Sequence, residues 1–136
     1  MDEYERQVYF SEVAAQCRFA LNAARCLENV LPRLTAAQRA RNHLLARLLH
    51  DEVFRSIHSF LGHASNISRL LWTSLPRRRR DEGEVVYNTR CAQVPRVKRA
   101  RELRKELALP EEHLLKNRAL RAHLVPLDGP EDSPRL

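Results

Sequence analysis

The chain has 136 residues and a formal net charge of +7, because its 24 Lys and Arg outnumber its 17 Asp and Glu. This length suits one domain with one core. Only three glycines are present, whereas Ala, Leu, Arg and Glu are abundant, which excludes a fold rich in tight β-hairpins and favours helices. We therefore expect an all-α protein, an antiparallel bundle of about four helices (two long, two shorter) over residues 1–125, with an irregular tail at 126–136.

The cysteines and the first residues of the chain indicate the cellular compartment in which we expect the protein. Cys17, Cys26 and Cys91 are odd in number and include no closely spaced pair, so neither a disulfide framework nor a zinc knuckle is indicated. The acidic start, MDEYERQVYF, excludes a secretory signal, and no uncharged run approaches the roughly twenty residues that span a bilayer. We expect a cytoplasmic protein without a membrane partner.

A long helix is predicted from residue 2 to residue 31, where apolar side chains recur at alternating steps of three and four. The members of this stripe are Phe10, Val13, Cys17, Ala20, Ala24, Leu27 and Leu31. Pro32 is expected to end the helix, and the hydroxyl of Thr35 to cap the next one. So short a connection predicts that the two helices run antiparallel.

The second long helix is predicted to reach Trp72 and to end before Pro76. Its apolar stripe consists of Leu45, Leu49, Val53, Ile57, Leu61, Ala64, Ile67 and Leu71. Gly62 predicts a close helix crossing there. We expect Ser65, Asn66 and Ser68 to hydrogen-bond to the facing helix rather than to contact a substrate.

Positive charge is concentrated in residues 77–121, which hold fourteen Lys and Arg against seven acidic residues, while the remainder holds ten of each. Residues 76–94 lack helical periodicity and are predicted to be a mobile connector. Its arginine block fits a solvated loop, a phosphate contact or a nuclear import signal. Residues 95–109 are predicted to form a basic amphipathic helix with Val97, Ala100, Leu103 and Leu107 on its apolar side. Such charge suits a phosphate backbone or an acidic partner. The candidate RNA-binding residues are Arg77, Arg78, Arg79, Arg80, Lys98, Arg101 and Lys105.

A last helix is predicted from Pro110 to residue 124, because proline suits the first helical position. Apolar residues surround this segment, which is typical of a central helix, so Arg118, Arg121 and His123 would lie near a core or an interface. The usual enzyme motifs are absent from the sequence. The four histidines of the second long helix, His43, His50, His58 and His63, do not show the spacing that two ligands of one metal favour, and we predict neither a metal nor a cofactor.

Two stretches, SNISRLLW from Ser65 and LKNRALRAHL from Leu115, resemble the HEPN superfamily, and in particular its abortive-infection (AbiU-like) toxin branch. The resemblance implies a helical bundle whose last helix carries Arg, four residues and then His. It also implies a metal-independent ribonuclease of a toxin–antitoxin or antiphage system, with an antitoxin protein as a partner. The catalytic residues that it implies are Arg118, Arg121 and His123.

The last motif of this branch reads R-N-H-F-E-H-F-D, and the present chain departs from it at Ala122, Val125 and Pro126. Pro126 stands where the pattern has its expected catalytic His, which implies weakened or lost activity. The family mechanism has a His assisting attack by the ribose 2′-hydroxyl while an Arg stabilises the phosphoryl charge. Arg118 and His123 would lie about 140° apart on an ideal helix, which favours a site shared across a homodimer.

Two alternatives to a ribonuclease remain open. In the first, the chain is a non-catalytic RNA-binding or antitoxin-like module, whose basic stretch supplies the affinity. In the second, it is a structural helical bundle that dimerises through the heptad stripe of residues 10–31. The first predicts salt-sensitive RNA binding without cleavage, and the second predicts dimerisation without RNA binding.

Overall fold

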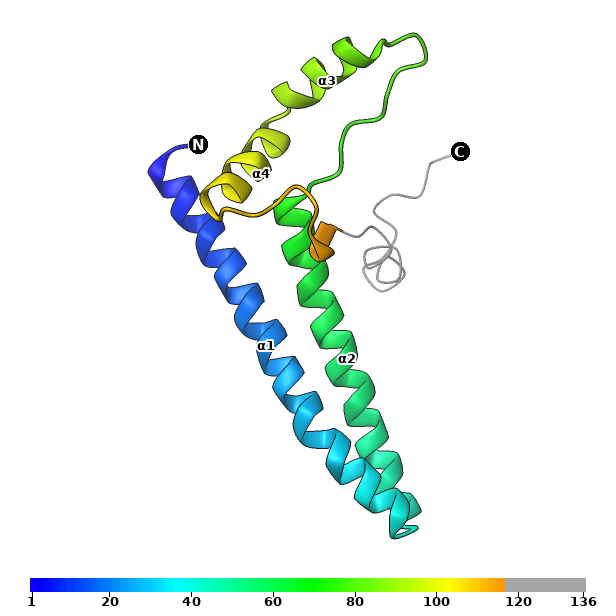
Figure 1. Cartoon of the computed structure of the whole chain (residues 1–136). Coiled ribbons are helices and arrows are strands. Elements are labelled where there is room, and N and C mark those ends of the chain that lie inside the picture. The colour runs from blue at the N-terminus through cyan, green and yellow to red at the C-terminus, as the bar shows by residue number, and fades with distance from the viewer. Residues whose placement is uncertain (117–136) are drawn as a thin grey trace.

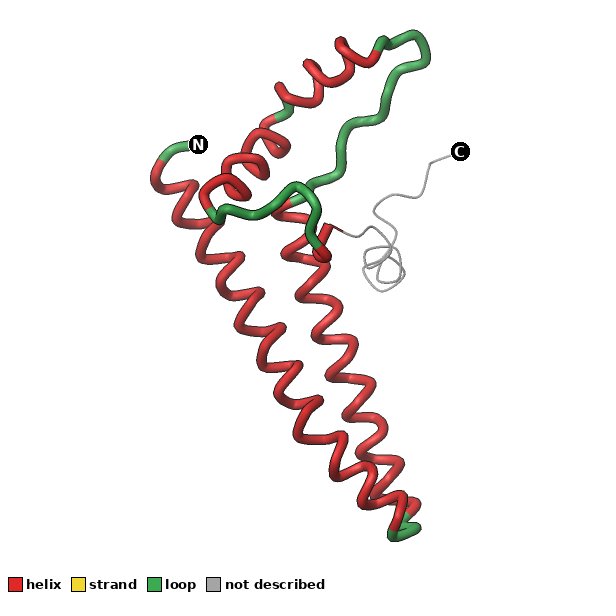
Figure 2. The backbone as a smooth tube through the Cα atoms, viewed as in Figure 1, coloured by secondary structure: helices red, strands yellow, loops and turns green. Residues whose placement is uncertain are grey.

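The computed structural model describes residues 1–116, and its helices form a long hairpin with a small head at the open end (Figure 1). In chain order the elements are α1 (Glu3–Arg39), α2 (His43–Leu71), α3 (Glu84–Gln93), α4 (Pro95–Glu106) and the short 3-10 helix η1 (Leu114–Lys116). Helices and loops account for all of the described residues (Figure 2). The expected all-α class, with two long and two shorter helices, is confirmed.

Helix α1 is longer than predicted, because it continues through Pro32 to Arg39. It begins with a capping box, in which Asp2 and Glu5 each accept a hydrogen bond from the other's backbone N–H. A proline inside a helix costs about 3 kcal/mol. On either side of Pro32, however, Val30 and Leu34 are buried in one cluster against α2, and this burial offsets the cost.

The turn between the two long helices therefore lies later in the chain than expected. Thr35 does not cap α2, because it lies inside α1 and its hydroxyl donates to the carbonyl oxygen of Leu31 at 3.1 Å. The cap is Asn42, whose side-chain oxygen accepts a hydrogen bond from the N–H of Leu45 at 3.3 Å. The two helices nevertheless run antiparallel, as predicted (Figure 1).

The side of α1 that faces α2 follows a heptad pattern, but not the stripe that was predicted. Its buried residues are Val13, Ala20, Ala23, Val30, Leu34 and Ala37. Val13 and Ala20 are confirmed, whereas Cys17 and Leu31 are exposed. These two side chains were predicted to be buried from hydropathy alone. They lie one position beyond the line of contact between α1 and α2, which we call the seam.

Gln16 occupies a seam position that an apolar residue would normally fill. Its Oε1 lies 2.7 Å from Nδ1 of His63 and accepts from Nδ2 of Asn66 at 3.3 Å. The prediction that Asn66 bonds to the facing helix is confirmed. For Ser65 and Ser68 it is wrong: both hydroxyls are buried and have no hydrogen-bond partner within residues 1–116, because both serines lie off the seam, on another side of α2.

The apolar side of α2 is confirmed in part. Its buried members are Leu49, Ala64, Ile67 and Leu71. Leu45 and Ile57 are exposed. The expected close crossing at Gly62 is wrong, because a Cβ atom built there would meet nothing within 4 Å.

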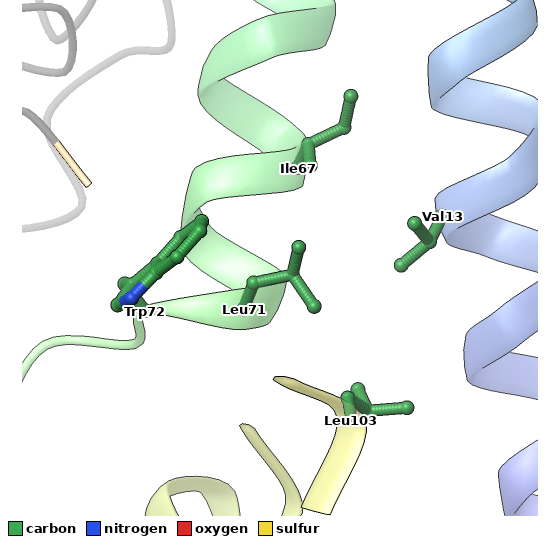
Figure 3. Close-up of a cluster of buried hydrophobic side chains, with 5 residues drawn as sticks. All are labelled: Val13, Ile67, Leu71, Trp72 and Leu103. Atoms are coloured by element: carbon green, nitrogen blue, oxygen red, sulfur yellow. The ribbon is translucent and has the colours of Figure 1, made fainter. Parts of the chain in front are cut away.

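The main core lies at the open end of the hairpin, where α4 closes it. Leu103 of α4 points between Val13 of α1 and Leu71 of α2, with Ile67 and Trp72 completing the cluster (Figure 3). The predicted apolar side of α4 is confirmed, because its first three members are buried. The fourth, the C-cap residue Leu107, is 39% exposed because the helix has already ended at Glu106.

Two segments differ from the sequence-based expectations. Half of the predicted connector is helical, since α3 occupies residues 84–93. The helix expected to start at Pro110 is wrong over residues 110–116, where the only helical element is η1. The chain leaves α4 through Ala108, whose φ is 53°, and His113 then stacks on Trp72 with 5.4 Å between the ring centroids. The contact between the rings of His113 and Trp72 therefore holds this segment against α2, where a continuous helix had been predicted. The rest of the predicted helix lies outside the described residues.

Candidate nucleic-acid interface

Half of the basic residues of α4 serve the fold. The guanidinium group of Arg96 donates two hydrogen bonds, of 3.1 and 3.3 Å, to the carbonyl oxygen of Ser74. Arg99 lies over the ring of Tyr9, 4.2 Å from its centroid. Arg104 donates to the carbonyl oxygen of Leu71 and so satisfies the end of α2. Each of these arginines holds α4 to another part of the chain.

Both acidic residues of α4 are also engaged, and both pair with the start of α1. Glu106 accepts from Nε of Arg6 at 3.2 Å, and Glu102 lies 3.8 Å from the α-amino group of Met1. These contacts direct the negative charge of α4 toward α1. Within residues 1–116 neither acid forms an ion pair with a cation of α4.

The remaining cations of α4, Lys98, Arg101 and Lys105, form what we call the basic face. All three are exposed, and none makes an ion pair or hydrogen bond within the described part of the chain. Their spacing of three and four residues places them on one side of the helix, over about 10 Å of its length and turned away from the buried Leu103. Three uncompensated charges on a rigid helix produce a local positive potential that suits a phosphate backbone.

The segment that leads into α3 is held by one ion pair. Arg90 binds Glu82 with two hydrogen bonds of 2.7 Å, in the bidentate geometry of a strong charge-assisted pair, and also donates to the carbonyl oxygen of Arg77. Tyr87 donates to the carbonyl oxygen of Pro76 at 2.9 Å. The hydrogen bond from Arg90 lowers the pKa of Glu82 from 4.5 to about 2, and the same contact raises the pKa of Arg90.

The four consecutive arginines, Arg77 to Arg80, differ in their contacts with this segment. Arg78 is engaged, because it donates to the carbonyl oxygen of Glu82 at 3.0 Å and lies 5.7 Å from the ring centroid of Tyr87. The side chains of the other three are exposed and make no hydrogen bond or ion pair within residues 1–116, although the charge of Arg79 acts on Glu82. These three arginines are therefore accessible to an anionic ligand.

The ion pair predicts a pH dependence of α3. Because the pKa of Glu82 is lower in the folded protein than in the unfolded chain, its contribution to stability is complete above pH 4.5 and disappears as the pH falls toward about 2. Glu82→Gln should remove this dependence and expose the α3 amides to faster hydrogen exchange already at neutral pH. Asp81→Asn, at an exposed acid of the same segment that precedes α3, should change neither. Equal exchange in both variants would contradict a structural role for the pair.

Sequence reasoning missed Glu82 and Arg90, and no local signal could have found them. They are eight residues apart, and only the fold of the connector brings them together. The implied catalytic residues Arg118, Arg121 and His123 lie outside the described part of the chain. Over residues 1–116 no three His, Cys, Asp or Glu side chains come together in a way that could hold a metal ion.

Comparison with known proteins adds no family to this description. No protein-family model, no curated protein and no solved structure matches the chain. Among the described helices, none combines the length and the apolar character needed to cross a bilayer. The HEPN resemblance therefore stays a prediction from the sequence.

Proposed function

We propose that this protein binds RNA through the outward side of α4. The observation that carries the proposal is the selective use of charge on this helix. Its two acids and three of its arginines are engaged with the rest of the fold, whereas the basic face of Lys98, Arg101 and Lys105 is left exposed.

Binding through these residues is directed at phosphates and not at bases. Lysine and arginine on a helix surface bind the backbone of a nucleic acid without reading its sequence, whereas base recognition in single-stranded RNA commonly uses exposed aromatic rings for stacking. The rings near α4, those of Tyr9 and Trp72, are already covered by Arg99 and Arg104. The exposed arginines of the connector would extend the contact along the strand.

The salt dependence of binding tests this proposal. For single-stranded nucleic acid the slope of log K against log salt concentration is about −0.7 per phosphate contact, so three contacts predict a slope near −2. The association constant should then fall about 20-fold between about 50 and 200 mM salt. Fluorescence anisotropy with a labelled single-stranded RNA measures this directly. Binding that is absent at low salt, or independent of salt, would overturn the proposal.

A second candidate function is metal-independent RNA cleavage in a toxin–antitoxin or antiphage system, and it is favoured by the HEPN resemblance alone. In this case a cytoplasmic protein would cleave through Arg118, Arg121 and His123, and a cognate antitoxin would restrain it. Incubation with mixed RNA in EDTA, beside His123→Ala, tests it through new ends that carry 2′,3′-cyclic phosphate. DNA, which lacks the 2′-hydroxyl, is the matched control substrate. RNA that stays intact in both samples would leave a binding protein with a degenerate motif.

A further inference from the structure

The far part of the α1–α2 hairpin extends beyond the head formed by α3 and α4 (Figures 1 and 2). Two helices that pack only on each other bury one stripe each and leave two flanks open to water. The antiparallel register follows from Gln16 lying against His63 and from Val30 sharing a cluster with Leu49. With this register known, each exposed residue can be placed on one flank or the other.

One of the two flanks, which we call the apolar flank, carries large hydrophobic side chains from both helices, with Glu28, Arg47 and His50 beside them toward the turn of the hairpin. Residues at the same heptad position beside the seam lie on one side of an antiparallel pair. The members of the predicted α1 stripe that lie beside the seam, and not in it, are all on this side. Large side chains of α2 lie opposite them. The main members are Cys17, Leu21, Leu31, Phe54, Ile57 and Leu61.

The opposite flank carries more polar side chains over the same length of hairpin, among them Asn22, Asn29, Arg33, Glu52, Arg55 and Ser59. Its exposed large apolar side chains are Phe19, Leu45 and Leu48. Toward the open end, Phe10 and Leu71 continue the apolar flank and pack with Leu103 of α4. The flank is thus covered by α4 at one end, and no other segment within residues 1–116 packs on the rest of it.

The size of the uncovered part fits an interface between two proteins. The exposed fractions are 55% for Leu21, 45% for Leu31, 54% for Phe54 and 38% for Ile57. Because a large apolar side chain presents about 200 Å² when fully accessible, these four expose roughly 400 Å². A standard interface buries about 800 Å² per partner, of which about 57%, or roughly 450 Å², is non-polar. The two areas agree.

We propose that the apolar flank is covered by a second copy of this chain, so that two hairpins form a four-helix bundle. A two-fold axis lets the same flank serve both protomers. Charge favours an antiparallel arrangement of the hairpins, because residues 77–116 hold twelve Lys and Arg against seven acids. Parallel hairpins would place two such heads side by side. Antiparallel hairpins would place the two heads at opposite ends of the bundle. Their separation would be much of the length of α1, which is about 55 Å, and this is far beyond the screening length of about 8 Å.

The mass of the full chain in solution tests this proposal. Light scattering at micromolar concentration should give twice the 15.9 kDa of one chain. Phe54→Glu, on the apolar flank, should reduce this mass about two-fold by placing a charge in the apolar centre of the interface. Leu48→Glu is the matched control, because Leu48 lies on the opposite flank of the same helix and is 57% exposed, against 54% for Phe54. Neither substitution touches the core, so both variants should fold.

The native cysteines provide an independent readout on the unmodified protein. Cys17 lies on the apolar flank and Cys26 on the other, and both thiols are exposed in the single chain. In the proposed dimer, a thiol reagent should modify Cys26 rapidly and Cys17 slowly, and dilution should abolish the difference. Equal reaction at all concentrations overturns the proposal, as does a dimer that only Leu48→Glu dissociates. A monomer in which Cys17 is protected would show that the chain covers its own flank, which also overturns it.

Discussion

Replacement of Lys98, Arg101 and Lys105 together by Gln is expected to weaken RNA binding by roughly 500-fold at about 50 mM salt. The expectation follows from counterion release, since three phosphate contacts at about −0.7 each raise the association constant roughly 500-fold at this salt concentration over its value near 1 M. The salt dependence should flatten at the same time. Because the three side chains are exposed and Gln is a good helix former, the thermal midpoint should change little.

The matched control removes the same charge from another helix. Arg18, Arg25 and Arg39 are exposed on α1 and make no contact within the described residues. Their replacement by Gln lowers the net charge of the protein by the same three units, but away from the basic face. Anisotropy titrations should show a small loss of affinity for this variant. A loss as large as that of the α4 variant would mean that overall charge, and not the basic face, governs binding.

Leu103→Ala is expected to lower the free energy of unfolding by about 3 kcal/mol. Leu103 is 0% exposed, and it is the residue through which α4 packs between the two long helices (Figure 3). Truncation removes buried methyl groups and leaves a cavity that the three surrounding helices cannot easily fill. For a chain of this size the thermal midpoint should fall by about 10 °C.

Leu107→Ala is the control for this prediction, because Leu107 is in the same segment and is 39% exposed. It should lower the free energy of unfolding by less than about 1 kcal/mol. Thermal and urea denaturation followed by circular dichroism measure both changes. An equal effect of the two truncations would contradict the assignment of Leu103 as the anchor of α4.

The two predictions separate folding from binding. The triple Gln variant should lose RNA affinity at unchanged stability, whereas Leu103→Ala should lose stability and, where α4 detaches, the orientation of the basic face as well. If both variants lost stability, the basic face would have a structural role that its exposed side chains do not show. If the proposed function holds, the core of the open end should act on binding only through the position of α4.

Local properties of the chain were correctly predicted from the sequence. Helix content follows from composition and from the scarcity of glycine, which act within a few residues. The apolar side of α4 was predicted because Val97, Ala100 and Leu103 recur at helical spacing on a short helix that packs on one side only. The concentration of positive charge is likewise a property of the chain, independent of its fold.

Tertiary contacts decided the rest. A local rule ended α1 at Pro32, but burial against α2 continues on both sides of it and outweighs the missing hydrogen bond. The choice of Gln16 over Cys17 at the seam depends on partners 47 and 50 residues away. The short helix α3 follows a connector that an ion pair between Glu82 and Arg90 holds in place.

The candidate interface was likewise predicted in part from the sequence and decided in part by tertiary contacts. The sequence by itself determined that α4 is basic, because charge and helical spacing are local. Only the tertiary structure decided which of its cations are free: Arg96, Arg99 and Arg104 are engaged with other segments, and Lys98, Arg101 and Lys105 are not. The physical reason is that the partners of an arginine, a carbonyl oxygen or an aromatic ring, lie far away in the chain and are brought near only by folding.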